Sequence, residues 1–280
     1  MSWYLLAAIN VVSISVGSLF QKLSMKKESS DPVASSIVFQ FLLGFITLIY
    51  GFIHGLHTPS VSLLPFFLLS GILYATGTLS FFKAYKSIEA SEATVLGGAG
   101  VVFTIAASFI FLRDKLTLLQ LLGVFLILVS VVIISITRQK FKLNTGAGLA
   151  LLGAGSYGLA VVSDSFIIRH YDAVSYLSLI CFIPGILIYL LYVKRTLVIL
   201  QEIRHIDRNL IFFTFLYSIQ AITFYVSLSL GALVSQISSI SRASIVLTVI
   251  LATIYLKEKK HIGRKIIAAI LTTIGVLLVT

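Results

Sequence analysis

Long apolar stretches separated by short polar breaks run through the whole of this 280-residue chain. A helix needs about 20 apolar residues to cross the hydrocarbon core of a bilayer, because each residue adds only about 1.5 Å. The sequence holds about ten such stretches, at 3–21, 33–53, 62–82, 93–112, 116–136, 146–168, 173–193, 209–230, 232–256 and 266–279. They leave almost nothing for a soluble domain, so we predict an all-α, multi-pass membrane protein.

The charge content supports this prediction. Only 11% of the residues are charged, whereas a soluble domain carries a charged surface of about 25–35%. The formal net charge of +11 does not indicate a nucleic-acid partner, because the basic residues fall in short runs between apolar stretches and form no basic face. The single cysteine, Cys181, excludes an intramolecular disulfide.

The basic residues are distributed unevenly over the predicted loops. Loops after even-numbered stretches hold only Arg113, Lys115 and Arg169, and nearly all other basic residues follow odd-numbered stretches. Cytoplasmic loops carry the excess of Lys and Arg. We therefore expect a protein of the inner (plasma) membrane with both termini outside.

The two halves of the chain resemble each other. Leu112-Arg113-Asp114-Lys115 corresponds to Leu256-Lys257-Glu258-Lys259 at an offset of 256 − 112 = 144 residues. Each half would hold five spans, and an odd number inserts the second copy in the opposite sense. We predict two inverted five-helix repeats, at residues 1–137 and 146–280, with a connecting loop at 138–145.

These motifs carry a family resemblance. Residues 91–114, from Ser-Glu-Ala-Thr to Asp114, and residues 235–258 resemble the fourth-to-fifth span segments of the EamA branch of the drug/metabolite transporter superfamily. The chain departs from the family pattern at Val101 and Ile245, where the family often has proline, and at Asp114, which replaces the usual glutamate. The resemblance implies a transporter whose substrate site lies between the repeats.

Arg242 is the outstanding candidate residue. It lies about ten residues into the ninth stretch, roughly 15 Å deep, where an arginine costs about 2.5–3.5 kcal/mol to insert. It requires either a structural ion pair or carbonyl cap, or an anionic group on a substrate, whose carboxylate or phosphate the planar guanidinium fits. The corresponding residue of the first half is Gly98.

Two acidic residues are candidates for coupling or charge balance. Asp164 lies near the end of the sixth stretch, where it could pair with Arg169, end the helix, balance Arg242 or carry a coupling proton. Glu92 lies near the start of the fourth stretch, where a structural pairing at the membrane interface is the simplest role.

The remaining candidates are polar side chains within the stretches. A lone tyrosine there is usually an interface anchor and a lone glutamine an interhelical hydrogen bond, but together they could line a cavity. Our candidate lining residues are Gln236, Ser239, Gln220, Tyr225, Tyr74, Tyr157 and Gln40. Gly97-Gly98-Ala99-Gly100 either permits close helix packing or loosens the helix at the repeat interface.

The sequence favours a secondary-active transporter of a small metabolite that is carboxylate-bearing or amino-acid-like. An exporter of lipophilic cations is the alternative within transporters. A membrane-embedded enzyme is a third class, but no HExxH-like pair or GxxxxGK[ST] sequence is present. A channel is disfavoured, because the sequence shows neither the repeated filter nor the charged ring that a channel needs. We expect no cofactor, metal or nucleic acid, and the expected partners are a small-molecule substrate and the lipid bilayer, around a monomer or a homodimer.

Overall fold

Helices make up nearly all of the chain in the computed structural model, which describes residues 3–107, 109–110, 117–137, 140–141, 144–232, 237 and 240–279. In the first half the elements are α1 (Trp3–Lys26), α2 (Pro32–His54), η1 (Val61–Leu63), α3 (Leu64–Ser87), α4 (Ala90–Gly98), α5 (Gly100–Ala107) and α6 (Leu118–Ser135). Two short strands follow, β1 (Ile136–Thr137) and β2 (Lys140–Phe141). In the second half they are α7 (Thr145–Ile168), α8 (Ala173–Ile180), α9 (Phe182–Leu191), η3 (Val193–Arg195), α10 (Thr196–Arg204), α11 (Arg208–Ser229), α13 (Ala243–Tyr255) and α14 (Ile262–Val279).

Polar side chains set the start of several spans. Asp31 caps α2 by accepting hydrogen bonds from the amides of Val33 and Ala34, both at 2.9 Å. Asn144, Asp172 and Asp207 cap α7, α8 and α11 in the same way. Each cap satisfies backbone amides that have no partner within the helix.

Seven helical segments of the described chain are long and apolar enough to cross a membrane. The shorter apolar helices α6 and α13, together with α14, lie where the sequence predicts the fifth, ninth and tenth spans. The all-helical class is therefore confirmed, with one small addition. At the end of the first predicted repeat, β1 pairs with β2 of the predicted connecting loop in an antiparallel arrangement that joins Ile136 to Phe141 and Thr137 to Lys140.

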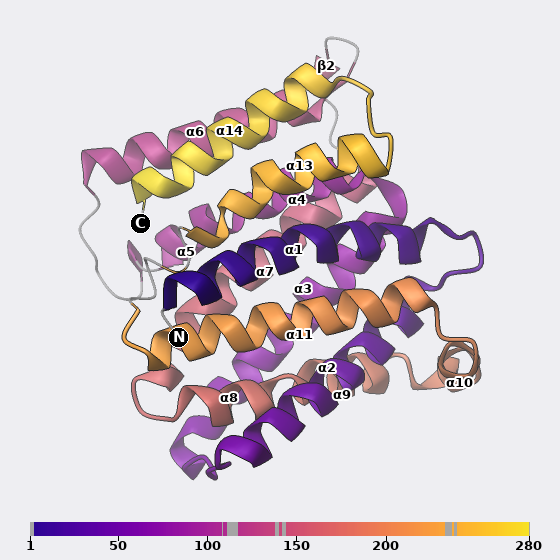
Figure 1. Cartoon of the computed structure of the whole chain (residues 1–280), viewed down its shortest axis with the longest axis vertical. Coiled ribbons are helices and arrows are strands. Elements are labelled where there is room, and N and C mark those ends of the chain that lie inside the picture. Colours follow the sequence, from indigo (N-terminus) through magenta and orange to yellow (C-terminus); the bar gives the residue numbers. More distant parts are fainter. Residues whose placement is uncertain are drawn as a thin grey trace.

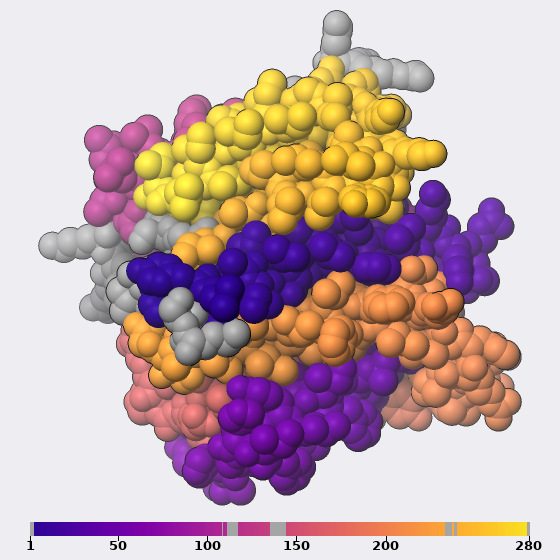
Figure 2. All heavy atoms as spheres, in the orientation of Figure 1, coloured from indigo at the N-terminus to yellow at the C-terminus, as the bar shows by residue number. Residues whose placement is uncertain are grey.

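The packing of the helices has the symmetry of two repeats. In element order, α1 corresponds to α7, α3 to α11, and α4–α5 to the segment that ends in α13. The α1–α11 contact has its counterpart in the α7–α3 contact, and the α1–α13 contact in the α7–α5 contact. Figure 2 shows α1 at the surface between α13 and α11. Each half thus packs its first span against the third and fourth spans of the other half.

The last spans of the two halves, α6 and α14, lie side by side and antiparallel (Figure 1). The hydroxyls of Ser130 and Thr272 are 2.6 Å apart. A second contact joins Gly123 of α6 and Gly275 of α14, where a methyl group added to Gly275 would meet the carbonyl oxygen of Gly123 at 2.7 Å. Gly123 precedes Ser130 whereas Gly275 follows Thr272, so the two helices run in opposite directions. Opposite directions of two equivalent spans are what an inverted repeat requires.

Glu258 joins the two halves at the end of the bundle where α1 finishes, here called the Lys26 end. Its carboxylate, 7% exposed, accepts hydrogen bonds from the amides of Ala90 and Ser91 at the start of α4, at 2.8 and 3.1 Å. The Ser91 hydroxyl donates a third, at 2.5 Å. The side chain of Lys265 bonds Glu89 beside it. An acidic residue of the second half therefore caps a helix of the first.

The outer surface of the bundle is apolar, as a lipid-facing surface must be. Phe52 is 68% exposed and Leu118 75%. The interior contains aromatic side chains from three spans, with the rings of Phe39 and Phe213 4.8 Å apart and those of Phe39 and Phe82 5.5 Å apart.

Candidate substrate site

Asp164 is buried between three helices near the bundle end opposite the Lys26 end. It precedes the last residue of α7 by four positions, about 6 Å along the helix axis. Its carboxylate accepts hydrogen bonds from the hydroxyl of Ser70 at 2.9 Å and of Tyr74 at 2.5 Å, both on α3, and from the phenol of Tyr176 on α8. The ion pairs of the described residues do not include Asp164. Three neutral hydroxyls, with no cation, therefore hold this carboxyl group.

A second set of hydrogen bonds continues along α3. The amide of Gln40 donates to the hydroxyl of Thr78 at 2.7 Å, and that hydroxyl is 2.9 Å from the phenol of Tyr157. The rings of Tyr157 and Tyr74 are 5.6 Å apart. The two sets therefore form one continuous polar region, here called the α3 seam, made of Ser70, Tyr74, Thr78, Gln40, Tyr157, Asp164 and Tyr176.

The sequence forms this seam by spacing. Ser70, Tyr74 and Thr78 are four residues apart, which places them in a row along one face of α3. A glycine makes room for the ring opposite, because a methyl group at Gly77 would lie 2.6 Å from an atom of the Tyr157 ring. Ser70, Thr78 and Tyr176 were not predicted from the sequence as site residues. The four-residue spacing of Ser70 and Thr78 from Tyr74 could have indicated the first two.

Arg242 belongs to a different cluster, at the interface of α1, α11 and α13. It immediately precedes α13, beside Ser241, whose hydroxyl donates to the side-chain oxygen of Asn10 at 2.7 Å. The Asn10 amide donates to the carbonyl of Gln220 at 2.8 Å. Arg242 is half-buried, and its Nε atom is buried without a hydrogen-bond partner among the described residues. A buried donor without a partner is costly, so Nε of Arg242 is a candidate donor to an acceptor outside the described residues.

The structure brings together some of the candidates predicted from sequence. Gln40, Tyr74, Tyr157 and Asp164 share the α3 seam, and the ring of Tyr225 on α11 lies 6.1 Å from that of Tyr176. Gln220 contributes its backbone carbonyl to the cluster of Asn10, Ser241 and Arg242, here called the Asn10 cluster. Gln236 and Ser239 lie outside the described residues.

Arg242 and Asp164 lie at different interfaces. The ion pairs of the described chain are Lys27–Asp207, Arg195–Asp31 and Lys265–Glu89, so neither Arg169 nor Arg242 pairs with Asp164. The α3–α7 interface that holds Asp164 and the α11–α1 interface beside Arg242 are equivalent under the repeat symmetry. The protein therefore places one acidic and one basic group at equivalent helix interfaces between its halves, although the two residues do not occupy equivalent positions, since Asp164 corresponds to Phe20 and Arg242 to Gly98 at the 144-residue offset.

Glu92 does not belong to either cluster. It lies in the first turn of α4 and lines a pocket of about 360 Å³ at the Lys26 end, with Lys22, Glu89 and Lys265 among its neighbours. Lys86, a basic residue that precedes Glu92 by six positions, donates to the hydroxyl of Ser30 at 2.9 Å and forms no ion pair with Glu92. No three His, Cys, Asp or Glu side chains of the described residues gather to hold a metal ion.

The glycines of the fourth span serve close packing. The helix is interrupted after Gly98, and a methyl group there would meet the Thr272 side chain at 2.3 Å. Gly100 and Gly158 bring α5 and α7 together, since a methyl group on Gly158 would lie 2.2 Å from the Gly100 carbonyl oxygen. The interruption has a counterpart in the second half, because 98 + 144 = 242 and α13 starts just after Arg242.

The fold and the two clusters define a helical membrane protein with polar groups buried between inverted halves. Residues 1–136 match the EamA-like transporter family, in agreement with the resemblance that the motifs carry. The matched family is one of transporters, and the long apolar helices of the described residues make the chain a multi-pass membrane protein.

Two individual proteins are similar to the chain. Uncharacterized protein MJ1333.1 of Methanocaldococcus jannaschii is 27% identical over 135 residues, which cover 48% of this chain and 96% of that protein. That relative thus has about the length of one half. A protein of known crystal structure superposes with a TM-score of 0.66 at 15% identity, over 99% of this chain and 95% of the other, which shows a shared fold.

Proposed function

We propose that the chain is a secondary-active, alternating-access transporter of a small, amino-acid-like metabolite. The observation that carries this proposal is the pair of separated groups, Asp164 and Arg242, neither of which has an ionic partner among the described residues. A zwitterionic solute offers a carboxylate for the guanidinium and an ammonium group for the carboxylate. Binding such a solute would offset the cost of burying both groups.

The location of the two clusters supports an alternating-access mechanism. In transporters built from inverted repeats, the substrate site lies at the interface between the repeats, and the halves rock around it. The α3 seam and the Asn10 cluster both join helices from different halves. A relative movement of the halves would change both at once.

The test measures exchange in proteoliposomes with three forms of each amino acid in a panel: the free acid, its amide and its N-acetyl derivative. The unmodified protein should prefer the free acid. Arg242→Ala should lose the preference for acid over amide, and Asp164→Asn the preference for free over acetylated amine. Arg242→Lys should retain part of the activity, since the charge survives while the planar fork does not. Equal transport of all three forms by the unmodified protein would refute the proposal.

A lipophilic cation is the second candidate substrate. The specific observation in its favour is the surroundings of Asp164, where Tyr74 and Tyr176 bond the carboxylate and Tyr225 lies against Tyr176. Tyrosine rings attract organic cations. If this is the substrate, Asp164→Asn abolishes exchange of a lipophilic cation such as tetraphenylphosphonium, and Arg242→Ala leaves it unchanged.

The orientation follows from charge in the same proposal. The Lys26 end would face the cytoplasm, and both termini would lie outside the inner membrane, because nearly all the basic loops belong to that end. Asp164 would then lie near the outer face and Glu92 near the inner face.

A further inference from the structure

The segment between α9 and α11 contains a helix, α10, that does not cross the membrane. With nine residues it is about 14 Å long, far short of a span. The helices on either side of it, α9 and α11, meet at the Lys26 end, and α10 runs across the direction of the spans, seen nearly end-on in Figure 1. From the sequence alone, residues 194–208 are predicted to be a loop between two spans.

One side of α10 is fixed to the bundle. Ile199 is 4% exposed and packs in a cluster with Val33 and Ile37 of α2. Glu202 accepts a hydrogen bond from Ser35 at 2.8 Å, and burial raises the pKa of the Glu202 carboxyl above its usual value. Just before α10, Arg195 pairs with Asp31 at 2.6 Å.

The opposite side of α10 is apolar and uncovered. Leu197, Leu200 and Ile203 are 76%, 46% and 53% exposed, and their spacing of three residues puts them on one face. Leu190 and Leu191 at the end of α9 are also exposed, and only Tyr192 and the turn η3 separate them from α10 along the chain. Lipid covers the apolar surface of the spans, and α10 follows the end of the span at Leu191 after four residues, so its uncovered face lies close to the edge of the same lipid.

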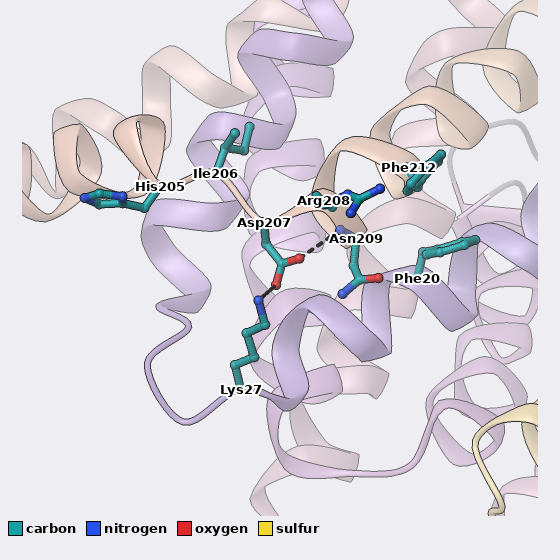
Figure 3. A pocket seen from close by; sticks show the side chains of 8 residues that line it. All are labelled: Phe20, Lys27, His205, Ile206, Asp207, Arg208, Asn209 and Phe212. Atoms are coloured by element: carbon teal, nitrogen blue, oxygen red, sulfur yellow. Dashed lines mark hydrogen bonds and ion pairs between the residues drawn. The ribbon is translucent and has the colours of Figure 1, made fainter.

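Basic side chains flank this face, as at a membrane–water interface. Lys194 and Arg204 are exposed at the two ends of α10. The chain then forms a pocket of about 400 Å³, shown in Figure 3, where Lys27 pairs with Asp207 at 2.8 Å. The Phe20 and Phe212 rings of that pocket are 5.3 Å apart.

We propose that α10 is an interfacial helix that inserts Leu197, Leu200 and Ile203 into the lipid leaflet at the Lys26 end and sets Lys194 and Arg204 against anionic headgroups. Helices with one apolar face and basic flanks lie in the interface in this way. Through Glu202–Ser35 and Arg195–Asp31, the leaflet would hold the start of α2, the span that carries Gln40.

The test places single tryptophans in the full chain, reconstituted in vesicles of mixed phosphatidylglycerol and phosphatidylcholine. Trp3→Phe removes the only native tryptophan. Leu200→Trp reports on α10, Phe45→Trp on the exposed apolar surface in the middle of α2, and Glu28→Trp on an exposed loop at the Lys26 end. Phospholipids brominated near the headgroup or at the chain end quench tryptophan at matching depths.

The fluorescence at position 200 should be quenched more by the shallow bromines than by the deep ones, with the reverse at position 45 and little quenching at position 28. Brominated phosphatidylglycerol should quench position 200 more than brominated phosphatidylcholine does, and Lys194→Gln with Arg204→Gln should reduce that preference by roughly fivefold per charge. Ile203→Trp repeats the test if Leu200→Trp does not fold.

Two outcomes would overturn the proposal. If the tryptophan at position 200 is quenched as little as the tryptophan at position 28, α10 lies in water. Blue-shifted emission at position 200 without quenching by either lipid would mean that protein, such as a second copy of the chain, covers the face. Equal quenching by the two headgroups would remove the anionic-lipid part and leave only apolar insertion.

Discussion

Removal of the Glu258 carboxylate should weaken the junction between the two halves. In Glu258→Ala, the amides of Ala90 and Ser91 and the Ser91 hydroxyl lose an acceptor at distances of 2.8, 3.1 and 2.5 Å. A hydrogen bond to a charged group contributes about 1.5–3 kcal/mol, and loss of a helix cap costs about 0.5–2 kcal/mol. Because water can reach a loop at the bundle end and replace part of the loss, we expect a destabilisation of about 2–4 kcal/mol in total.

The single cysteine provides the assay. Cys181 is buried, so a thiol-reactive dye becomes fluorescent only as the detergent-solubilised protein unfolds on heating. Glu258→Ala should lower the midpoint of that transition by several degrees. Glu258→Gln, which keeps one acceptor oxygen, should lower it less. The exposed Glu28 provides the control variant Glu28→Ala. A midpoint for Glu258→Ala equal to that of Glu28→Ala would refute the reasoning.

Three further predictions concern other parts of the molecule. Tyr176→Phe removes a donor from buried Asp164 and should destabilise by about 1–3 kcal/mol; combined with Asp164→Asn it should cost less than the sum of the two, and strict additivity in the dye assay would contradict the bond. Gly158→Ala should destabilise by about 1–3 kcal/mol through overpacking, whereas Gly263→Ala, which meets no atom within 4 Å, should be neutral in the same measurement. A cysteine at Lys140 should resist an impermeant thiol reagent in intact cells and react in inverted vesicles, and the opposite pattern would reverse the proposed orientation.

The sequence predicted the fold well because the constraints on it are local and repeated. Apolar length gives the spans, and the 144-residue offset gives the two halves. The candidate site was predicted only in part. Asp164, Tyr74, Tyr157 and Gln40 were identified as polar residues in apolar stretches, but hydroxyl residues such as Ser70 and Thr78 are common in membrane helices and attract attention only once their partners are known.

Two features could not be predicted because they depend on which helices become neighbours. The contact of Glu258 with the start of α4 joins residues 168 positions apart. The helix α10 was missed because its apolar residues are too few for a span and its charged residues resemble those of any loop. The spacing of Leu197, Leu200 and Ile203 can be seen in the sequence. Only the packing of α10 against α2 shows that these three side chains lie on the uncovered side of the helix.

The antiparallel contact of α6 and α14 constrains how such a protein can be built from its parts. A chain of half the length would leave the face of Gly123 and Ser130 uncovered, and an identical copy could cover it only if inserted upside down. The membrane would then have to receive equal numbers of both orientations. When both copies are part of one chain, their ratio is fixed at one to one, and the sequence of each half can change independently of the other. Arg242 is equivalent to Gly98 in the first half. Two identical chains could not carry an arginine at this position in one copy and a glycine in the other.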